Sequence, residues 1–293
     1  MAIPLIQSSS LDFHKSSATT RILRTHLRFL EVEQPHLRLL NLPSCNSTPK
    51  LKAWKEPMTL TKEVVDEKDI SAVTERESNE FTTLKRRFLN FKKEKYLKHL
   101  EHFRSLADEQ SPKFLIISCA DSRVCPSNIL GIQPGEAFVV RNIANLVPSY
   151  ENGPSETKAA LEFSVNTLKV KNILVVGHSR CGGIRALMSM DDETSSSFIR
   201  SWVINGKSAR TSTKAVASNL SFDQQCKHCE KESVNYSLMN LLTYPWIKDK
   251  LNKEELSIHG GYYDFIDCSF EKWTLENSRV DDQVSIRNRE FWS

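Results

Sequence analysis

Two short segments of the sequence contain side chains of the types that bind transition metals. Cys119 follows an apolar run at residues 113–118, and His178 and Cys181 lie at the end of a second run that begins at residue 172. Both runs are typical of buried parallel strands, and groups just past the carboxyl ends of such strands converge on one crevice. We therefore expect these three side chains to meet, although they are far apart in the sequence.

The ligand types in this group indicate which metal it would bind. Sulfur and imidazole ligands favour Zn²⁺ over Mg²⁺ or Ca²⁺, and three protein ligands leave the fourth tetrahedral position open to water. An open position is the mark of a catalytic site. Coordination lowers the pKa of bound water toward about 7, so a hydroxide nucleophile would exist at neutral pH. Cys119, His178 and Cys181 are thus predicted to hold one catalytic zinc ion.

A carboxylate and a guanidinium lie close to the first cysteine. Asp121 and Arg123 follow Cys119 by two and four residues, in the turn that leaves the strand. A free carboxylate beside zinc could take the open position, whereas one paired with an arginine can accept a hydrogen bond from the bound hydroxide and orient it. We interpret the pair as a gate that keeps the metal open.

Three other functions could use the same residue types. A zinc deaminase also combines histidine with cysteines, but its pattern needs H-x-E, and Ser179 follows His178 instead. A cysteine phosphatase needs a longer phosphate loop than the segment from Cys119 to Arg123. A scaffold or anion-binding module with a structural zinc would need a fourth protein ligand, and none is evident.

A second group of cysteines lies further along the chain. Cys226, His228 and Cys229 form a C-x-x-C with an intervening histidine, but no second pair stands at zinc-finger spacing. We interpret these thiols as structural or redox-sensitive rather than as metal ligands.

The elements that would position these groups alternate in type. Apolar, β-branched runs predict strands at 113–118, 137–141 and 172–179, and helical patterns occur at 156–168, from 181, at 225–243 and at 246–251. Residues 256–273 predict two or three further strands. The alternation predicts an α/β fold: a mostly parallel central β-sheet covered by helices on both faces, with an N-terminal helical arm and a C-terminal helical and strand extension.

The chain divides into four segments. Residues 1–55 are rich in Ser, Thr and Arg and poor in acids, as in an organellar transit peptide, and favour the chloroplast stroma over the mitochondrion; a merely disordered extension is the alternative. Residues 56–112 predict an acidic linker and an amphipathic helical arm. Residues 113–275 would form the zinc-binding catalytic domain, and residues 276–293 a polar, loosely held tail.

Composition excludes several classes of protein. The 293 residues are 39% hydrophobic, as in a globular protein, and no apolar run approaches the ~18–20 residues that cross a bilayer, so membrane insertion is not expected. The net charge of +4 is dispersed and does not indicate nucleic-acid binding. Seven widely spaced cysteines favour reduced thiols over a disulfide framework.

The segments CADSRVCPS from Cys119, QPGEAFVVRNIANLVP from Gln133 and GHSRCGGI from Gly177 resemble the signature segments of β-class carbonic anhydrases. CEKESVNYSLMNLLTYPWI from Cys229 and GGYYDF from Gly260 are similar to the plant members, and the resemblance spans residues 81–273. It implies reversible hydration of carbon dioxide to bicarbonate and a proton by a zinc-bound hydroxide. The family's zinc ligands and its Asp–Arg dyad match the five residues already singled out.

The resemblance also implies a substrate pocket. It would comprise the amide of Gln110, the apolar Phe138, Ile143 and Phe163, and Gly182 at the ligand turn. Plant enzymes often have a tyrosine where this chain has Phe163, so any role of that hydroxyl is absent here.

Two further implications concern regulation and assembly. Some relatives bind inhibitory bicarbonate at a second site that uses a tryptophan three residues before the first cysteine; this chain has Ile116 there, although Arg141, also associated with that site, is present. The chain therefore resembles the plant-like type with an open zinc site. Resemblance further implies a homodimer or higher homo-oligomer, with N-terminal helices embracing the neighbour and the walls around Phe138, Ile143 and Phe163 contributed across the interface.

Overall fold

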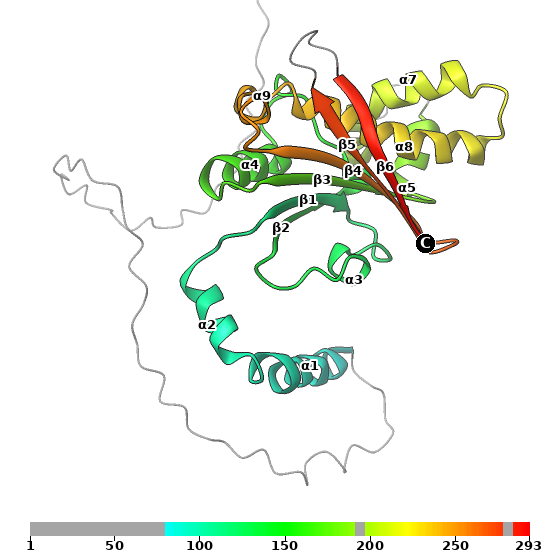
Figure 1. Ribbon diagram of the computed structural model, residues 1–293. Helices are drawn as coiled ribbons and strands as arrows, with labels where there is room; N and C mark the ends of the chain where they lie inside the picture. Colours follow the sequence, from blue (N-terminus) through cyan, green and yellow to red (C-terminus); the bar gives the residue numbers. More distant parts are fainter. Residues whose placement is uncertain (1–79, 191–196, 278–283) are drawn as a thin grey trace, which may run out of the picture. The chain divides into compact units, whose positions relative to one another are not determined.

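The computed structural model describes residues 80–190, 197–277 and 284–293 (Figure 1). The expected leader at 1–55 and the linker up to residue 79 lie outside the described residues. The helices are α1 (Glu80–Phe91), α2 (Leu100–Asp108), α3 (Pro126–Ile129), α4 (Glu156–Glu162), α5 (Gly182–Met188), α6 (Phe198–Val203), α7 (Lys207–Val216), α8 (Phe222–Leu241) and α9 (Pro245–Asn252). The strands are β1 (Phe114–Cys119), β2 (Ala137–Asn142), β3 (Asn172–His178), β4 (Ser257–Asp264), β5 (Ser269–Asn277) and β6 (Val284–Trp292).

These strands form one sheet in the order β2-β1-β3-β4-β5-β6. β1 pairs in parallel with both β2 and β3, and β3 pairs in parallel with β4. β5 and β6 add antiparallel strands at one edge. The mostly parallel sheet flanked by helices, predicted from the alternation of runs, is confirmed.

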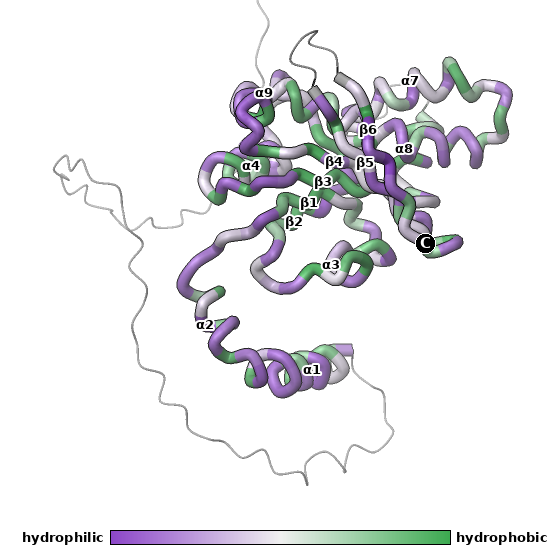
Figure 2. The backbone as a smooth tube through the Cα atoms, in the orientation of Figure 1, coloured by the Kyte–Doolittle hydropathy of each residue, from purple (hydrophilic) through white to green (hydrophobic). Residues whose placement is uncertain are grey.

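The two faces of the sheet differ in their cover. Alternate residues of β1 and β3, Leu115, Ile117, Ile173 and Val175, pack with residues of α4, α8 and α9 into the largest core cluster. The opposite face presents Ile116 and Val176, which cluster with Phe270 of β5 and pack against α3, the loop after it and neighbouring strands. Among the described residues, α3 is the helix that contributes to this cluster. Figure 2 shows hydrophobic residues along β1 and β3, in contrast to the largely hydrophilic α1.

The long helix α8 lies directly against β3. It begins with a capping box, in which the Ser221 hydroxyl and the Gln224 side chain satisfy each other's backbone N–H groups. A Cβ atom added at Gly177 of β3 would lie 2.7 Å from Val234 Cγ2, so only glycine allows this approach. The contact brings the middle of α8, from Glu230 to Val234, next to the end of β3.

The N-terminal arm contains the predicted amphipathic helices. α1 and α2 are joined through a π-helical turn at Lys92–Tyr96, and Phe103 packs against Phe91 and Tyr96. Phe81, Leu84 and other apolar side chains of α1 remain exposed, because the described part of this chain does not cover them. Among the described residues, no helix is both long enough and apolar enough to cross a membrane.

The C-terminal residues differ from expectation. The tail after residue 275 was predicted to be loosely held, but β6 pairs along β5, and Trp292 stacks on Phe270 with 5.0 Å between ring centroids. Polar residues dominate this strand because it is an edge strand with much of its surface in water. α6 and α7 were likewise not assigned from the sequence.

The contact between β4 and β5 provides a stability test. Gly260 is buried, and a Cβ there would lie 2.3 Å from Cε2 of the fully buried Trp273. We predict that Gly260→Ala lowers the free energy of unfolding by about 1–3 kcal/mol through overpacking. The midpoint of urea unfolding measures the change. Gly153→Ala is the matched control, since a Cβ there meets no atom within 4 Å, and equal midpoints for the two variants would contradict the packing argument.

Candidate metal centre

The pairing of β1 with β3 brings the three predicted ligands together. Cys119 is the last residue of β1, His178 is the last residue of β3, and Cys181 is the N-cap of α5. Their ligand atoms all lie within 4.8 Å of one another, the two sulfur atoms are 4.0 Å apart, and the three residues are buried. Among the described residues, no fourth histidine, cysteine or carboxylate joins this group.

The orientation of His178 fits a metal ligand. Its Nδ1 lies 2.9 Å from the carbonyl oxygen of Ser179 and can donate to it, which leaves the lone pair on Nε2. Nε2 is buried and has no hydrogen-bond partner among the described residues. A buried, unpartnered imidazole nitrogen beside two thiols is costly unless a metal occupies the position. The donor set therefore fits a tetrahedral N,S-liganded ion such as Zn²⁺.

The two thiols are coupled through a hydrogen bond between their sulfur atoms. This hydrogen bond lowers the pKa of Cys119. The same hydrogen bond, together with burial, raises the pKa of Cys181. A cation beside the pair would favour the thiolate form of both groups.

Asp121 and Arg123 form a tightly bound pair beside the group. Arg123 donates from Nε to Asp121 Oδ1 at 2.9 Å and from Nη2 to Oδ2 at 2.7 Å, and its backbone N–H also donates to Oδ1 at 2.9 Å. These hydrogen bonds lower the pKa of Asp121 well below its usual range. Nη2 also donates to the carbonyl oxygen of Arg180 at 3.3 Å, which links the pair to the second ligand loop.

Arg141 holds the backbone of the first ligand loop. It projects from β2, and its Nε donates to the Cys119 carbonyl at 3.0 Å while Nη2 donates to the Asp121 carbonyl at 2.5 Å. Sequence analysis considered Arg141 only in connection with a second bicarbonate site. In this chain its guanidinium supports the turn between a predicted ligand and the predicted gate.

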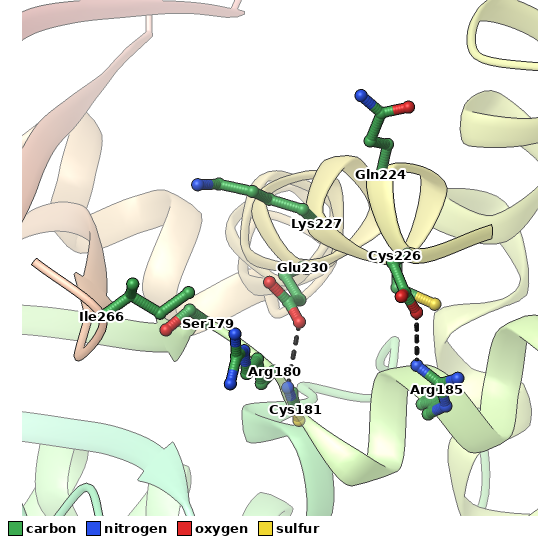
Figure 3. Close-up of a pocket in the computed structure, with 10 residues that line it drawn as sticks. Ser179, Arg180, Cys181, Arg185, Gln224, Cys226, Lys227, Glu230 and Ile266 are labelled. Carbon is green, nitrogen blue, oxygen red and sulfur yellow. Dashed lines mark hydrogen bonds and ion pairs between the residues drawn. The ribbon is translucent and has the colours of Figure 1, made fainter. Parts of the chain in front are cut away.

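Glu230 holds the second ligand loop. This residue of α8 is 3% exposed and accepts hydrogen bonds from the Cys181 backbone N–H at 2.9 Å and from the Tyr262 hydroxyl at 2.8 Å. Figure 3 shows Glu230 directed at Cys181 in a cavity of about 410 Å³ that α8 shares with this loop. Burial raises the pKa of Glu230, and the two donors oppose that rise. Sequence analysis missed this residue, although a carboxylate within the buried stripe of a helix was a usable signal.

The predicted substrate-pocket residues are only partly brought together. Phe138 and Phe163 are in contact, with 5.8 Å between ring centroids, and Ile143 lies against Gly183 in the first turn of α5. Gly182 begins α5, and a Cβ there would meet no atom within 4 Å. Gln110 is exposed between α2 and β1, and among the described residues no hydrogen bond joins it to the metal group.

The second cysteine group lies on α8, where Cys226 and Cys229 share a buried cluster with Cys119 and Cys181. Cys226 and Cys229 are buried, and burial raises the pKa of both thiols, that of Cys229 to about 12. His228 Nδ1 lies 3.0 Å from the hydroxyl of Thr213. Within the described part of the chain these residues form no candidate metal group, and their interpretation as structural or redox-sensitive thiols stays a prediction.

Comparisons with known proteins identify the family of this chain. The carbonic anhydrase family profile matches residues 114–270. Beta carbonic anhydrase 5, chloroplastic, from Arabidopsis thaliana is 62% identical over 220 residues, which are 73% of each protein. Beta carbonic anhydrase 6, mitochondrial, from the same plant is 52% identical over 227 residues, which are 77% of this chain and 78% of that protein.

A solved structure shows the same fold. It belongs to a study of two tetrameric beta-carbonic anhydrases from the ascomycete Sordaria macrospora; it is 29% identical, with a TM-score of 0.60, and the match covers 66% of this chain and 96% of that one. Profile, relatives and fold agree, and the chain belongs to the β-carbonic anhydrase family.

Proposed function

We propose that this carbonic anhydrase carries out the reversible hydration of carbon dioxide to bicarbonate and a proton with one zinc ion held by Cys119, His178 and Cys181. The observation that supports it most directly is the buried three-ligand group, in which His178 Nε2 lacks a partner. When bound, zinc would lower the pKa of water and supply a nucleophile near neutral pH. Three protein ligands leave a position for that water.

The protein's part in the reaction is to hold and orient. The Glu230 carboxylate and the Arg141 guanidinium fix the two loops that carry the ligands. Arg123 occupies both oxygens of Asp121, so this carboxylate is kept from becoming a fourth ligand. With Arg123 bound in this way, Asp121 can still accept a hydrogen bond from the water or hydroxide that reacts with carbon dioxide. These hydrogen bonds support the proposal that the pair acts as the gate expected from the sequence.

We further propose that the substrate pocket is completed in a homodimer or larger homo-oligomer. Ile143 is 42% exposed and Phe163 44% exposed in the single chain, which is unusual for the wall of a carbon dioxide pocket. The exposed apolar face of α1 would find its cover on a neighbouring subunit. The tetrameric enzymes of Sordaria macrospora support such assembly.

The first test concerns the ligands. We predict that Cys181→Ser loses most of its zinc and its carbon dioxide hydration activity, since loss of a ligand should weaken metal binding by more than the roughly 10–100-fold typical of a lost supporting contact. Metal analysis and stopped-flow hydration assays, with and without a chelator, measure both. Cys229→Ser, which changes an equally buried cysteine outside the group, should keep its zinc. A fully active, zinc-replete Cys181→Ser enzyme would refute the assignment.

The second test concerns the gate. We predict that Arg123→Ala keeps its zinc but loses about 10²–10³ in hydration rate, because Asp121 is released toward the metal. Zinc content, hydration rate and X-ray absorption at the zinc edge are measured on the same preparation. Arg185→Ala is the control, since Arg185 also pairs with an aspartate, Asp223, at 2.6 Å but on the exposed surface. A near wild-type rate in zinc-replete Arg123→Ala would reduce the pair to an ordinary ion pair.

The third test concerns location. We propose that residues 1–55 are a transit peptide for the chloroplast stroma; one relative is chloroplastic and another mitochondrial. A fluorescent protein fused to residues 1–60 should enter plastids in plant cells. The same fusion with Arg21, Arg24 and Arg28 changed to Glu should stay in the cytosol. Cytosolic fluorescence from the unaltered fusion would exclude a targeting role, and mitochondrial fluorescence would exclude the choice of plastid.

A further inference from the structure

The GGYYDF segment ends in an aromatic residue that the mechanism above does not use. Phe265 follows directly after β4, at the end of the sheet where the ligands meet. The carbon Cζ of Arg123 lies 4.5 Å from the centroid of its ring. The His178 ring is stacked on the same side chain, with 6.2 Å between centroids and 29° between ring planes. One aromatic ring therefore contacts both a proposed metal ligand and the proposed gate.

The backbone of Phe265 is tied to the ligand loop. Its N–H donates to the Ser179 hydroxyl at 3.1 Å, and the Ser179 N–H donates to the Tyr263 carbonyl at 3.0 Å. On the next residue, the Ile266 N–H donates to Asp264 Oδ1 at 3.1 Å. These bonds tie the backbone that carries the ring to the loop that carries His178 and Cys181.

The ring supplies a constraint that the hydrogen bonds of Arg123 do not supply. All donors of a guanidinium lie in its plane, so the bonds to Asp121 and to the Arg180 carbonyl resist sliding within that plane. Tilting out of the plane is resisted only by a group packed against the face of the guanidinium. The Cζ carbon of Arg123 lies over the Phe265 ring, so this ring is placed to resist such motion, whereas the Arg123 side chain is otherwise half exposed to solvent.

We propose that Phe265 is a positioning residue for the Asp121–Arg123 gate: its ring holds the Arg123 guanidinium in the orientation that keeps Asp121 off the metal. The proposal rests on the proposed role of that pair. Phe265 also packs with the buried cluster around Cys119 and Cys181. Leucine at this position keeps most of that packing but removes the aromatic face. The substitution therefore separates the effect of the ring on Arg123 from the contribution of Phe265 to the core.

The test compares Phe265→Leu with Phe265→Tyr, which keeps the ring. We expect Phe265→Leu to bind a full complement of zinc, to lose about three- to tenfold in kcat with little change in KM, and to show Arg123 in a crystal structure displaced from Asp121 Oδ2. Phe265→Tyr should restore kcat. Phe222→Leu is the matched control, because the Phe222 ring also lies beneath an arginine but outside the gate. The Cζ carbon of Arg185 is 5.0 Å from the centroid of the Phe222 ring. The kcat of this variant should not change.

A double-mutant cycle with Arg123→Ala separates the proposals. If Phe265 acts through Arg123, adding Phe265→Leu to Arg123→Ala causes no further loss of kcat. An unchanged kcat in Phe265→Leu, a loss that is fully additive with Arg123→Ala, or a loss of zinc would each overturn the positioning role. If instead Arg123→Ala alone is near wild type, the gate itself fails, which is a different result from an inert Phe265.

Discussion

The metal group depends on the parallel pairing of β1 with β3. Ser118 lies opposite Val176 in this ladder, so both strands end at the same edge of the sheet and present Cys119 and His178 side by side. The pairing is held by the buried residues of both strands, among them Ile117 and Val175, which occupy the main core cluster. A register shift of one residue would turn these apolar side chains out of the core. The positions of the ligands are therefore fixed by the packing of the whole core and not only by contacts at the site.

Charge is the second constraint on this region. Two thiols, Asp121 and the buried Glu230 lie around one small volume, and uncompensated anions there would be costly. Hydrogen-bond donors held in place by the fold compensate these groups. Arg123 donates to Asp121, and Arg141 donates to the carbonyl oxygens of the loop. The Cys181 N–H and the Tyr262 hydroxyl donate to Glu230. A divalent cation held by the two thiols and His178 would complete this balance of charge.

Most strands and helices could be predicted from the sequence, and so could the convergence of the ligands, because each rests on short-range patterns. Apolar β-branched runs identify strands whatever their partners, and the parallel topology places their ends together. The supporting residues could not be predicted in the same way. Glu230 is separated from Cys181 by 49 positions in sequence, and the contact between them exists only because Gly177 lets α8 approach β3. β6 was missed for a related reason, since an edge strand facing water carries little apolar signal.

The exposed apolar residues of the single chain point to the remaining part of the site. β2 is an edge strand, and Val139, Ile143 and Phe163 on or near it are each more than a third exposed. A carbon dioxide molecule is apolar and is retained by surfaces that exclude water, so a half-open wall would hold it poorly. A second copy of the chain packed on this edge would bury these side chains. It would also shield the unpaired backbone hydrogen-bonding groups of the edge strand from water. In the proposed homo-oligomer, assembly and substrate binding would therefore be coupled, because the surface buried between the subunits would also complete the proposed pocket.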